Sequence, residues 1–189
     1  MEPDYFACFS TPQIAAQVCA LAALAPDTPV ILLVEQRRDD TLECTILAFD
    51  YPYEFSLITG ILAGIGFSIR AGDVFTSRAT DAGPQSRRRI VDRFIGTRAD
   101  ARNPREWQAS LQATLREVIG ILEHGGGEAL NQARARVNEL VARWLARAKV
   151  DALAVRFGLP RLFAFFKMIL RAFFRTITSS SRSLSISIM

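Results

Sequence analysis

The sequence predicts an α+β domain, and three observations support this prediction. A β-branched run at residues 30–34 and an alternating run at residues 42–49 indicate strands. Residues 55–65 repeat apolar side chains at i, i+3, i+4 and i+7, which is the spacing of an amphipathic helix. Half of the 189 residues are hydrophobic, so a core can be buried. We therefore expect one domain of ordinary size, or a small domain with extensions.

Residues 1–41 predict a helix and a strand that lead into the domain. Thr11 is expected to cap the helix, with Pro12 at its first position, where the missing N–H group costs nothing. Pro26 ends this helix, and the strand at residues 30–34 follows.

The strand at residues 42–49 alternates in polarity, so its side chains are expected to face two sides of a sheet. Leu42, Cys44, Ile46 and Ala48 are expected on one side, and Glu43, Thr45, Leu47 and Phe49 on the other.

The helix over residues 55–65 carries Gly60 and Gly64, which we expect to let a neighbouring element pack closely, and Gly66 ends it as a left-handed cap. A third strand is predicted over residues 67–77. A fourth, antiparallel to the third, is predicted over residues 88–95 and places Ile90, Asp92 and Phe94 on one side.

Asn103 and Pro104 open a long helix that reaches about residue 123. Residues 42–123 thus run strand, helix, strand, strand, helix, which is most of a ferredoxin-like βαββαβ unit. Residues 128–175 predict a helical extension. Residues 176–189 form a Ser-rich tail in which Leu184, Ile186 and Ile188 alternate with serines, as in a short strand.

The turn at residues 50–55 joins the strand to the helix and is the clearest candidate site. Backbone N–H groups of Tyr53, Glu54 and Phe55 at the helix start are placed to meet a carboxylate, and Asp50 to accept from an ammonium group. The alternative is that Asp50 is only a helix cap in an ordinary turn.

Two segments resemble the first ACT domain of bacterial PII uridylyltransferases. Residues 50–55 (Asp-Tyr-Pro-Tyr-Glu-Phe) resemble the family's Asp-Arg-Pro-Tyr-Leu-Phe stretch, and residues 73–78 resemble its Ala-x-Ile-Phe-Thr-Thr-Arg strand end. Tyr5–Phe6 and residues 11–15 resemble the segment that leads into this ACT domain. The resemblance covers about residues 5–150 and implies a ferredoxin-like ACT domain at residues 42–123, with an N-terminal helix and a C-terminal helical extension.

The resemblance implies a non-catalytic regulatory module of nitrogen metabolism that senses an amino acid, glutamine being the family's ligand, or pairs with another ACT domain or a second copy through a sheet edge. The nucleotidyltransferase motif and the His-rich hydrolase site are lacking, so no catalysis and no cofactor are expected. Many ACT domains carry Gly where Tyr53 stands. The implied ligand-binding residues are Asp50, Tyr51, Pro52, Tyr53, Glu54, Phe55 and Asp73.

Several of these residues have structural alternatives. Asp73 is either a polar group facing the ligand cleft or a solvated strand residue. Three consecutive arginines, Arg87, Arg88 and Arg89, have two interpretations. They contact an acidic partner or nucleic acid, or they are charged residues that prevent aggregation at the start of a hairpin strand. Asp92 and Glu106 are expected to be ordinary surface carboxylates.

Composition argues against other classes. The net charge of +4 accompanies no nucleic-acid motif, so no nucleic-acid partner is expected. Three widely spaced cysteines and one histidine predict no zinc site and no disulfide, but buried reduced thiols of a cytoplasmic protein. No secretory signal and no spanning helix are expected. Two alternatives stay open: a uridylyltransferase fragment that is inactive alone, and a peripheral membrane or scaffold protein that acts through the basic aromatic residues 162–174.

Overall fold

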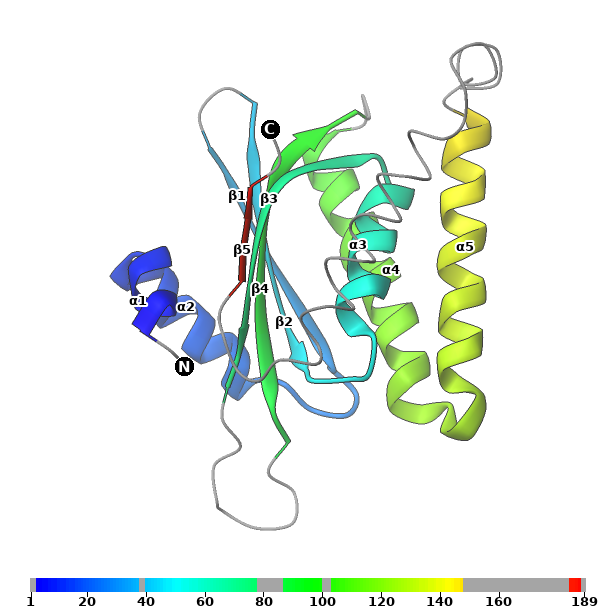
Figure 1. The fold of residues 1–189 in the computed structure, drawn as a ribbon, viewed down its shortest axis with the longest axis horizontal. Helices are drawn as coiled ribbons and strands as arrows, with labels where there is room; N and C mark the ends of the chain where they lie inside the picture. Colours follow the sequence, from blue (N-terminus) through cyan, green and yellow to red (C-terminus); the bar gives the residue numbers. More distant parts are fainter. Residues whose placement is uncertain (1–2, 38–39, 78–86, 100–102, 148–183, 188–189) are drawn as a thin grey trace.

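The computed structural model describes residues 3–37, 40–77, 87–99, 103–147 and 184–187, and Figure 1 shows their arrangement. In chain order the elements are α1 (Pro3–Cys8), α2 (Thr11–Ala22), β1 (Val30–Gln36), β2 (Leu42–Phe49), α3 (Glu54–Gly64), β3 (Phe67–Thr76), β4 (Arg89–Arg98), α4 (Pro104–His124), the 3-10 turn η1 (Gly126–Glu128), α5 (Ala129–Arg147) and β5 (Leu184–Ser187). The α+β class is confirmed.

The sheet is antiparallel throughout, in the order β1-β2-β4-β3-β5. Ile46 of β2 lies between Leu32 of β1 and Asp92 of β4. The sequence predicted that a βαββαβ unit would begin at β2 and end in a strand after the second helix. Instead α5 follows α4, and β1 occupies the place beside β2. β1 and β2 are consecutive strands joined by a short connection, and such strands usually pair with each other.

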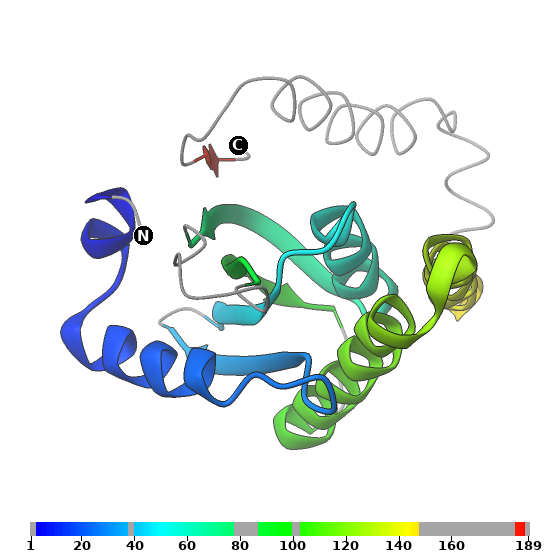
Figure 2. The same ribbon diagram turned by 90° about the horizontal axis from the view of Figure 1, so that it is seen from below.

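Helices cover both faces of the sheet, with α1 and α2 on one face and α3, α4 and α5 on the other (Figure 2). The larger core lies under α3 and α4 and includes Cys44, Ile46, Ile58 and Trp107. The smaller core lies under α1 and includes Leu47, with other members Tyr5, Phe9, Ala20, Phe75 and Val91. The predicted alternation of β2 is therefore confirmed at its centre.

Phe49 departs from that alternation, because it packs in the larger core although Leu47 belongs to the smaller one. It is the last residue of β2, where the chain turns toward α3, and the guanidinium of Arg87 lies 4.1 Å from the centre of its ring.

The two glycines of α3 permit close helix packing, as predicted. A Cβ atom on Gly60 would lie 2.5 Å from Cγ1 of Val137, and one on Gly64 would lie 2.7 Å from Cγ of Leu140. The left-handed cap at Gly66 is confirmed by its φ of 80°. α5 therefore rests directly on the backbone of α3.

The helix starts follow local side-chain rules. Asn103 Oδ1 accepts from the backbone N–H of Arg105 at 2.9 Å, as expected of a cap. In α2 the cap is Ser10 rather than Thr11, and its backbone N–H donates to Gln13 Oε1 at 2.9 Å.

The cysteines are free, but only Cys44 is buried, whereas Cys19 is exposed and Cys8 is half-buried. The expectation of buried thiols was therefore wrong for Cys19. The strand predicted in the tail is present as β5, which lies along β3. The predicted aromatic segment 162–174 and the hairpin loop around Gly83 and Pro84 lie outside the described residues.

Candidate functional site

The corner, which we define as residues 50–55, is held by its own backbone and by one side chain. Asp50 donates its N–H to the carbonyl of Arg88 at 2.9 Å, which extends the β2–β4 ladder into the turn. Glu54 donates its N–H to the Tyr51 carbonyl at 3.2 Å, and its carboxyl accepts from the Tyr51 N–H at 3.3 Å. The Glu54 side chain thus folds back over the start of α3, so an acidic group of the chain itself lies where a ligand carboxylate was expected.

Tyr53 precedes α3 in the left-handed conformation, with a φ of 64°. Few residues other than glycine adopt this conformation without strain. The ring of Tyr53 is exposed and lies 4.7 Å from the guanidinium of Arg134 on α5. This backbone geometry explains why a glycine suits the position in a similar turn.

A side-chain link joins the corner to α4. The Tyr51 hydroxyl donates to Glu123 Oε2, and Arg87 Nη1 donates to both Glu123 oxygens at 2.7 and 2.8 Å. Burial and the bond to Glu123 raise the pKa of Tyr51. Burial alone raises the pKa of Glu123, but the bonds from Tyr51 and Arg87 outweigh it, so the net pKa is lowered. Glu123 is therefore a stable anion beside the corner.

Two buried carboxyls, Glu54 in the corner and Asp92 on β4, form no ion pair with any cation of the described residues. Their exposed fractions are 4% and 1%. Glu54 Oε1 and Asp92 Oδ1 have no hydrogen-bond partner among the described residues. The ring of Phe55 lies 5.7 Å from that of Phe94, which places the first turn of α3 over β4. The charge of Asp92 on β4 is one of the causes that raise the pKa of Glu54, so the two carboxyls lie within electrostatic reach of each other.

Burial raises the pKa of both carboxyls well above the ordinary value. For Glu54 the charges of Asp92 and Asp50 add to the effect, while the bond from Tyr51 and the charge of Arg87 oppose it. For Asp92 the charge of Asp50 adds to burial. Asp50 itself is at the surface, 3.2 Å from Arg88 Nε. The site can therefore hold protons or receive a cation.

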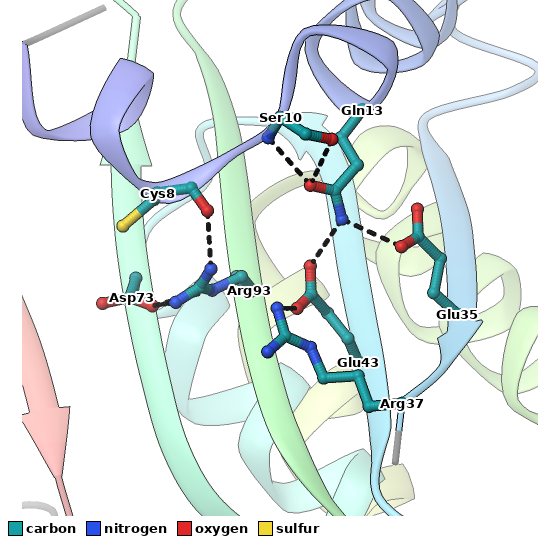
Figure 3. A network of polar contacts seen from close by, with 8 residues as sticks. All are labelled: Cys8, Ser10, Gln13, Glu35, Arg37, Glu43, Asp73 and Arg93. Carbon is teal, nitrogen blue, oxygen red and sulfur yellow. Dashed lines mark hydrogen bonds and ion pairs between the residues drawn. The ribbon is translucent and has the colours of Figure 1, made fainter.

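The opposite face of the sheet carries a different polar cluster, the back network, formed by Cys8, Ser10, Gln13, Glu35, Arg37, Glu43, Asp73 and Arg93 (Figure 3). Arg93 donates to Asp73 Oδ2 through Nε at 2.9 Å and through Nη2 at 2.7 Å, and its Nη1 donates to the carbonyl of Cys8 at 2.9 Å. This contact ties α1 to the centre of the sheet.

Glu43 is the second buried acid of the back network, with 1% exposed. Its Oε1 accepts from Gln13 Nε2 at 3.2 Å, and its Oε2 forms an ion pair with Arg37. Gln13 also donates to Glu35 at 2.9 Å. The network therefore holds α2 as well as α1.

The structure divides the predicted site residues between the two faces. Residues 50–55 lie together at the corner, with Tyr51 and Glu54 buried and Asp50, Pro52 and Tyr53 exposed. Asp73 lies in the back network instead. Because it is 6% exposed and paired with Arg93, its interpretation as a solvated strand residue is wrong.

Three residues at the corner were not predicted there: Arg87, Asp92 and Glu123. Asp92 was expected at the surface, which is wrong, because it is 1% exposed. The signal was present, since Asp92 alternates with Ile90 and Phe94 on an apolar face of β4. The contacts of Arg87 and Glu123 depend on the packing of α4, so no local pattern indicated them.

Within the described part of the chain, no group of three or more His, Cys, Asp or Glu side chains is placed to hold a metal ion. None of the described helices is long and apolar enough to cross a membrane. The chain matches no protein-family model and no curated protein.

Proposed function

We propose that this chain is a non-catalytic regulatory module of the ACT type. In this proposal the sheet is ferredoxin-like, and its fourth strand is β1, which precedes the unit formed by β2, α3, β3, β4 and α4 in the chain. The support is topological. β2, α3, β3, β4 and α4 follow one another as in that fold, with the inner order β2-β4-β3. β1 lies antiparallel beside β2, where the final strand of the fold would lie.

The observation that carries the proposal is the corner itself. Two buried carboxyl oxygens, Glu54 Oε1 in the turn that resembles the ACT ligand loop and Asp92 Oδ1 on β4, lack a hydrogen-bond partner among the described residues. Buried polar groups without partners are rare and cost stability, and they are found where function requires them. The left-handed Tyr53 adds local backbone strain at the same turn.

The proposed ligand is a free amino acid, with glutamine as the first candidate from the family resemblance. Asp50 is exposed at the rim and supplies a carboxylate beside Arg88. Binding that favours one arrangement of the corner would shift the population of any partner contact coupled to it.

A sheet edge supplies the proposed pairing surface, and the contacts favour the β3 side of the sheet, where β5 is the outermost strand, over the β1 side. Gln112 of α4 occupies the outer edge of β1, because its amide accepts from the N–H of Leu32 at 2.9 Å and donates to the carbonyl of Val30 at 3.3 Å. A side-chain amide of this kind blocks strand addition there. The β3 edge accepts a strand within the chain itself, where β5 pairs with Ala71–Val74.

Isothermal titration calorimetry of the whole chain with glutamine tests the proposal. We expect binding that weakens at least tenfold in Asp50→Ala, while Glu106→Ala, at an exposed position in the first turn of α4 and so at the opposite end of that helix from Glu123, leaves it unchanged. An absence of binding to any free amino acid, together with a monomer at high concentration in light scattering, would contradict it.

A further inference from the structure

We propose that Glu54 and Asp92 form a buried site for a primary ammonium group, so that the corner recognises the amine of its ligand from below. The inference rests on the proposed function and names the chemistry of the same site. The site consists of two side chains, Glu54 on α3 and Asp92 on β4, and each has an oxygen without a hydrogen-bond partner among the described residues.

Glu54 and Asp92 can accept more hydrogen bonds than the described residues donate to them. An ionised carboxylate offers about four acceptor positions. Glu54 uses one oxygen for the Tyr51 N–H, and its Oε1 is buried without a partner, as is Asp92 Oδ1. A primary ammonium group carries three N–H donors and one positive charge, which complements two such carboxyls in number and in sign.

The charged groups around Glu54 and Asp92 also favour a cation as the ligand. The titratable or charged groups around the pair are Asp50 at the end of β2, Tyr51 in the corner, Arg87 before β4 and Glu123 on α4. Arg87 is engaged by Glu123, and Arg88 by Asp50. No described cation is therefore bonded to Glu54 or Asp92, and an incoming ammonium group meets acids whose arginine neighbours are already paired.

Binding of the ammonium group is expected to displace a proton from a buried carboxyl. In the free protein the buried carboxyls hold protons, because the uncharged form is favoured in a site without a cation. The ammonium group enters as a cation, a carboxyl gives its proton to the buffer, and a carboxylate–ammonium pair remains. Affinity should therefore rise with pH and binding should release protons.

The test uses the whole chain and three probes: glutamine, N-acetylglutamine and ethylamine. Calorimetry in two buffers with different ionisation enthalpies counts the protons released, and thermal unfolding reports ethylamine binding. We expect glutamine to release protons, N-acetylglutamine to bind at least tenfold more weakly, and millimolar ethylamine to raise the melting temperature. Glu54→Gln and Asp92→Asn keep the side-chain shape and should abolish both the proton release and the ethylamine response.

The outcomes separate the two proposals. Glutamine binding without proton release, and equal in the two variants, overturns the ammonium site but leaves the proposed function standing. An ethylamine response that depends on Glu54 and Asp92, without amino-acid binding, supports the site and overturns the sensing function. If neither glutamine nor ethylamine binds, the carboxyls hold only protons and the ammonium site fails; if no other free amino acid binds either, the sensing function fails as well. Should a variant not fold, the pH dependence of glutamine and ethylamine binding to the unaltered chain decides the matter.

Discussion

The corner and the back network bury the same kind of group and treat it in opposite ways. In the back network, Glu43 faces Arg37 and Asp73 faces Arg93. At the corner, Glu54 and Asp92 are equally buried, yet neither has an ion pair with a described cation. Glu43 Oε2 also lacks a hydrogen bond among the described residues, but it keeps its ion pair with Arg37. Burial alone therefore does not define a functional acid. The presence of a matched arginine separates a carboxyl that fastens two layers from one that is available to a proton or a ligand.

The largest expected effect comes from removing the Arg93–Asp73 ion pair of the back network. Arg93→Leu leaves Asp73 buried without its cation and removes the bond to the Cys8 carbonyl. We expect the free energy of unfolding to fall by about 3 kcal/mol, because an unpaired buried charge is costly. Urea denaturation at pH 7 measures the loss.

The control for that prediction is the exposed pair between Arg136 and Glu117. Arg136→Leu should cost less than about 1 kcal/mol, since exposed ion pairs contribute little. Adding Asp73→Asn to Arg93→Leu should recover part of the loss. Equal costs for the two arginine variants would show that the Arg93 pair does not fasten α1 to the sheet.

The second prediction concerns Glu54 and Asp92, which have no arginine partner among the described residues, and the pH dependence of the free energy of unfolding. The folded-state pKa of Glu54 and Asp92 is raised, so their contribution to stability is present at low pH and is lost as pH rises through the folded-state pKa. Asp92→Asn should therefore stabilise the protein at pH 8, by about 1.4 kcal/mol for each unit of pKa shift removed.

Urea denaturation between pH 5 and pH 8 checks this prediction, with Glu43→Gln as the comparison. Glu43 has an arginine partner, so its variant should lose stability at pH 8 rather than gain it. The contrast between the two regions fails if both substitutions shift the free energy of unfolding in the same direction.

A third prediction compares a tyrosine of the corner with one of the smaller core on the opposite face of the sheet. The Tyr51 hydroxyl donates to the anionic Glu123, whereas the Tyr5 hydroxyl donates to the neutral Gln17 at 2.6 Å. Tyr51→Phe should cost about 2 kcal/mol and Tyr5→Phe about 1 kcal/mol, because bonds to charged acceptors are stronger. Thermal unfolding of the two variants measures the difference, and a larger loss at Tyr5 would contradict it.

The smallest effect concerns the backbone of the corner. Tyr53→Gly and Tyr53→Ala both remove the contact with Arg134, so their difference isolates the left-handed conformation. The glycine variant should be more stable than the alanine variant by about 1 kcal/mol. Chemical denaturation of the pair of variants tests this, and an alanine variant of equal stability would show that the turn changes its conformation when Tyr53 is replaced.

The sequence by itself determined where most of the helices and strands lie, although it gave no indication of α1. The alternation at residues 42–49, the glycine at position 66 and the cap at Asn103 each follow from rules that act over a few residues. The corner was found for the same reason, because a strand, a proline-containing turn and an apolar helix are consecutive in the chain. The resemblance to ACT domains, many of which carry Gly where Tyr53 stands, agrees with the left-handed backbone conformation of Tyr53.

Only the tertiary structure decided which strand lies beside β2 and which acids find a cation. Arg93 reaches a carbonyl 85 residues away, and Tyr51 reaches a carboxylate 72 residues away. The pattern around Asp73 and that around Asp92 are alike, since both alternate with apolar residues on a strand. What differs is the element packed over each face: α1 is held by Arg93 over one, and the first turn of α3 brings another acid over the other. Periodicity records which side chains are buried, whereas charge pairing depends on contacts between distant segments that no local pattern encodes.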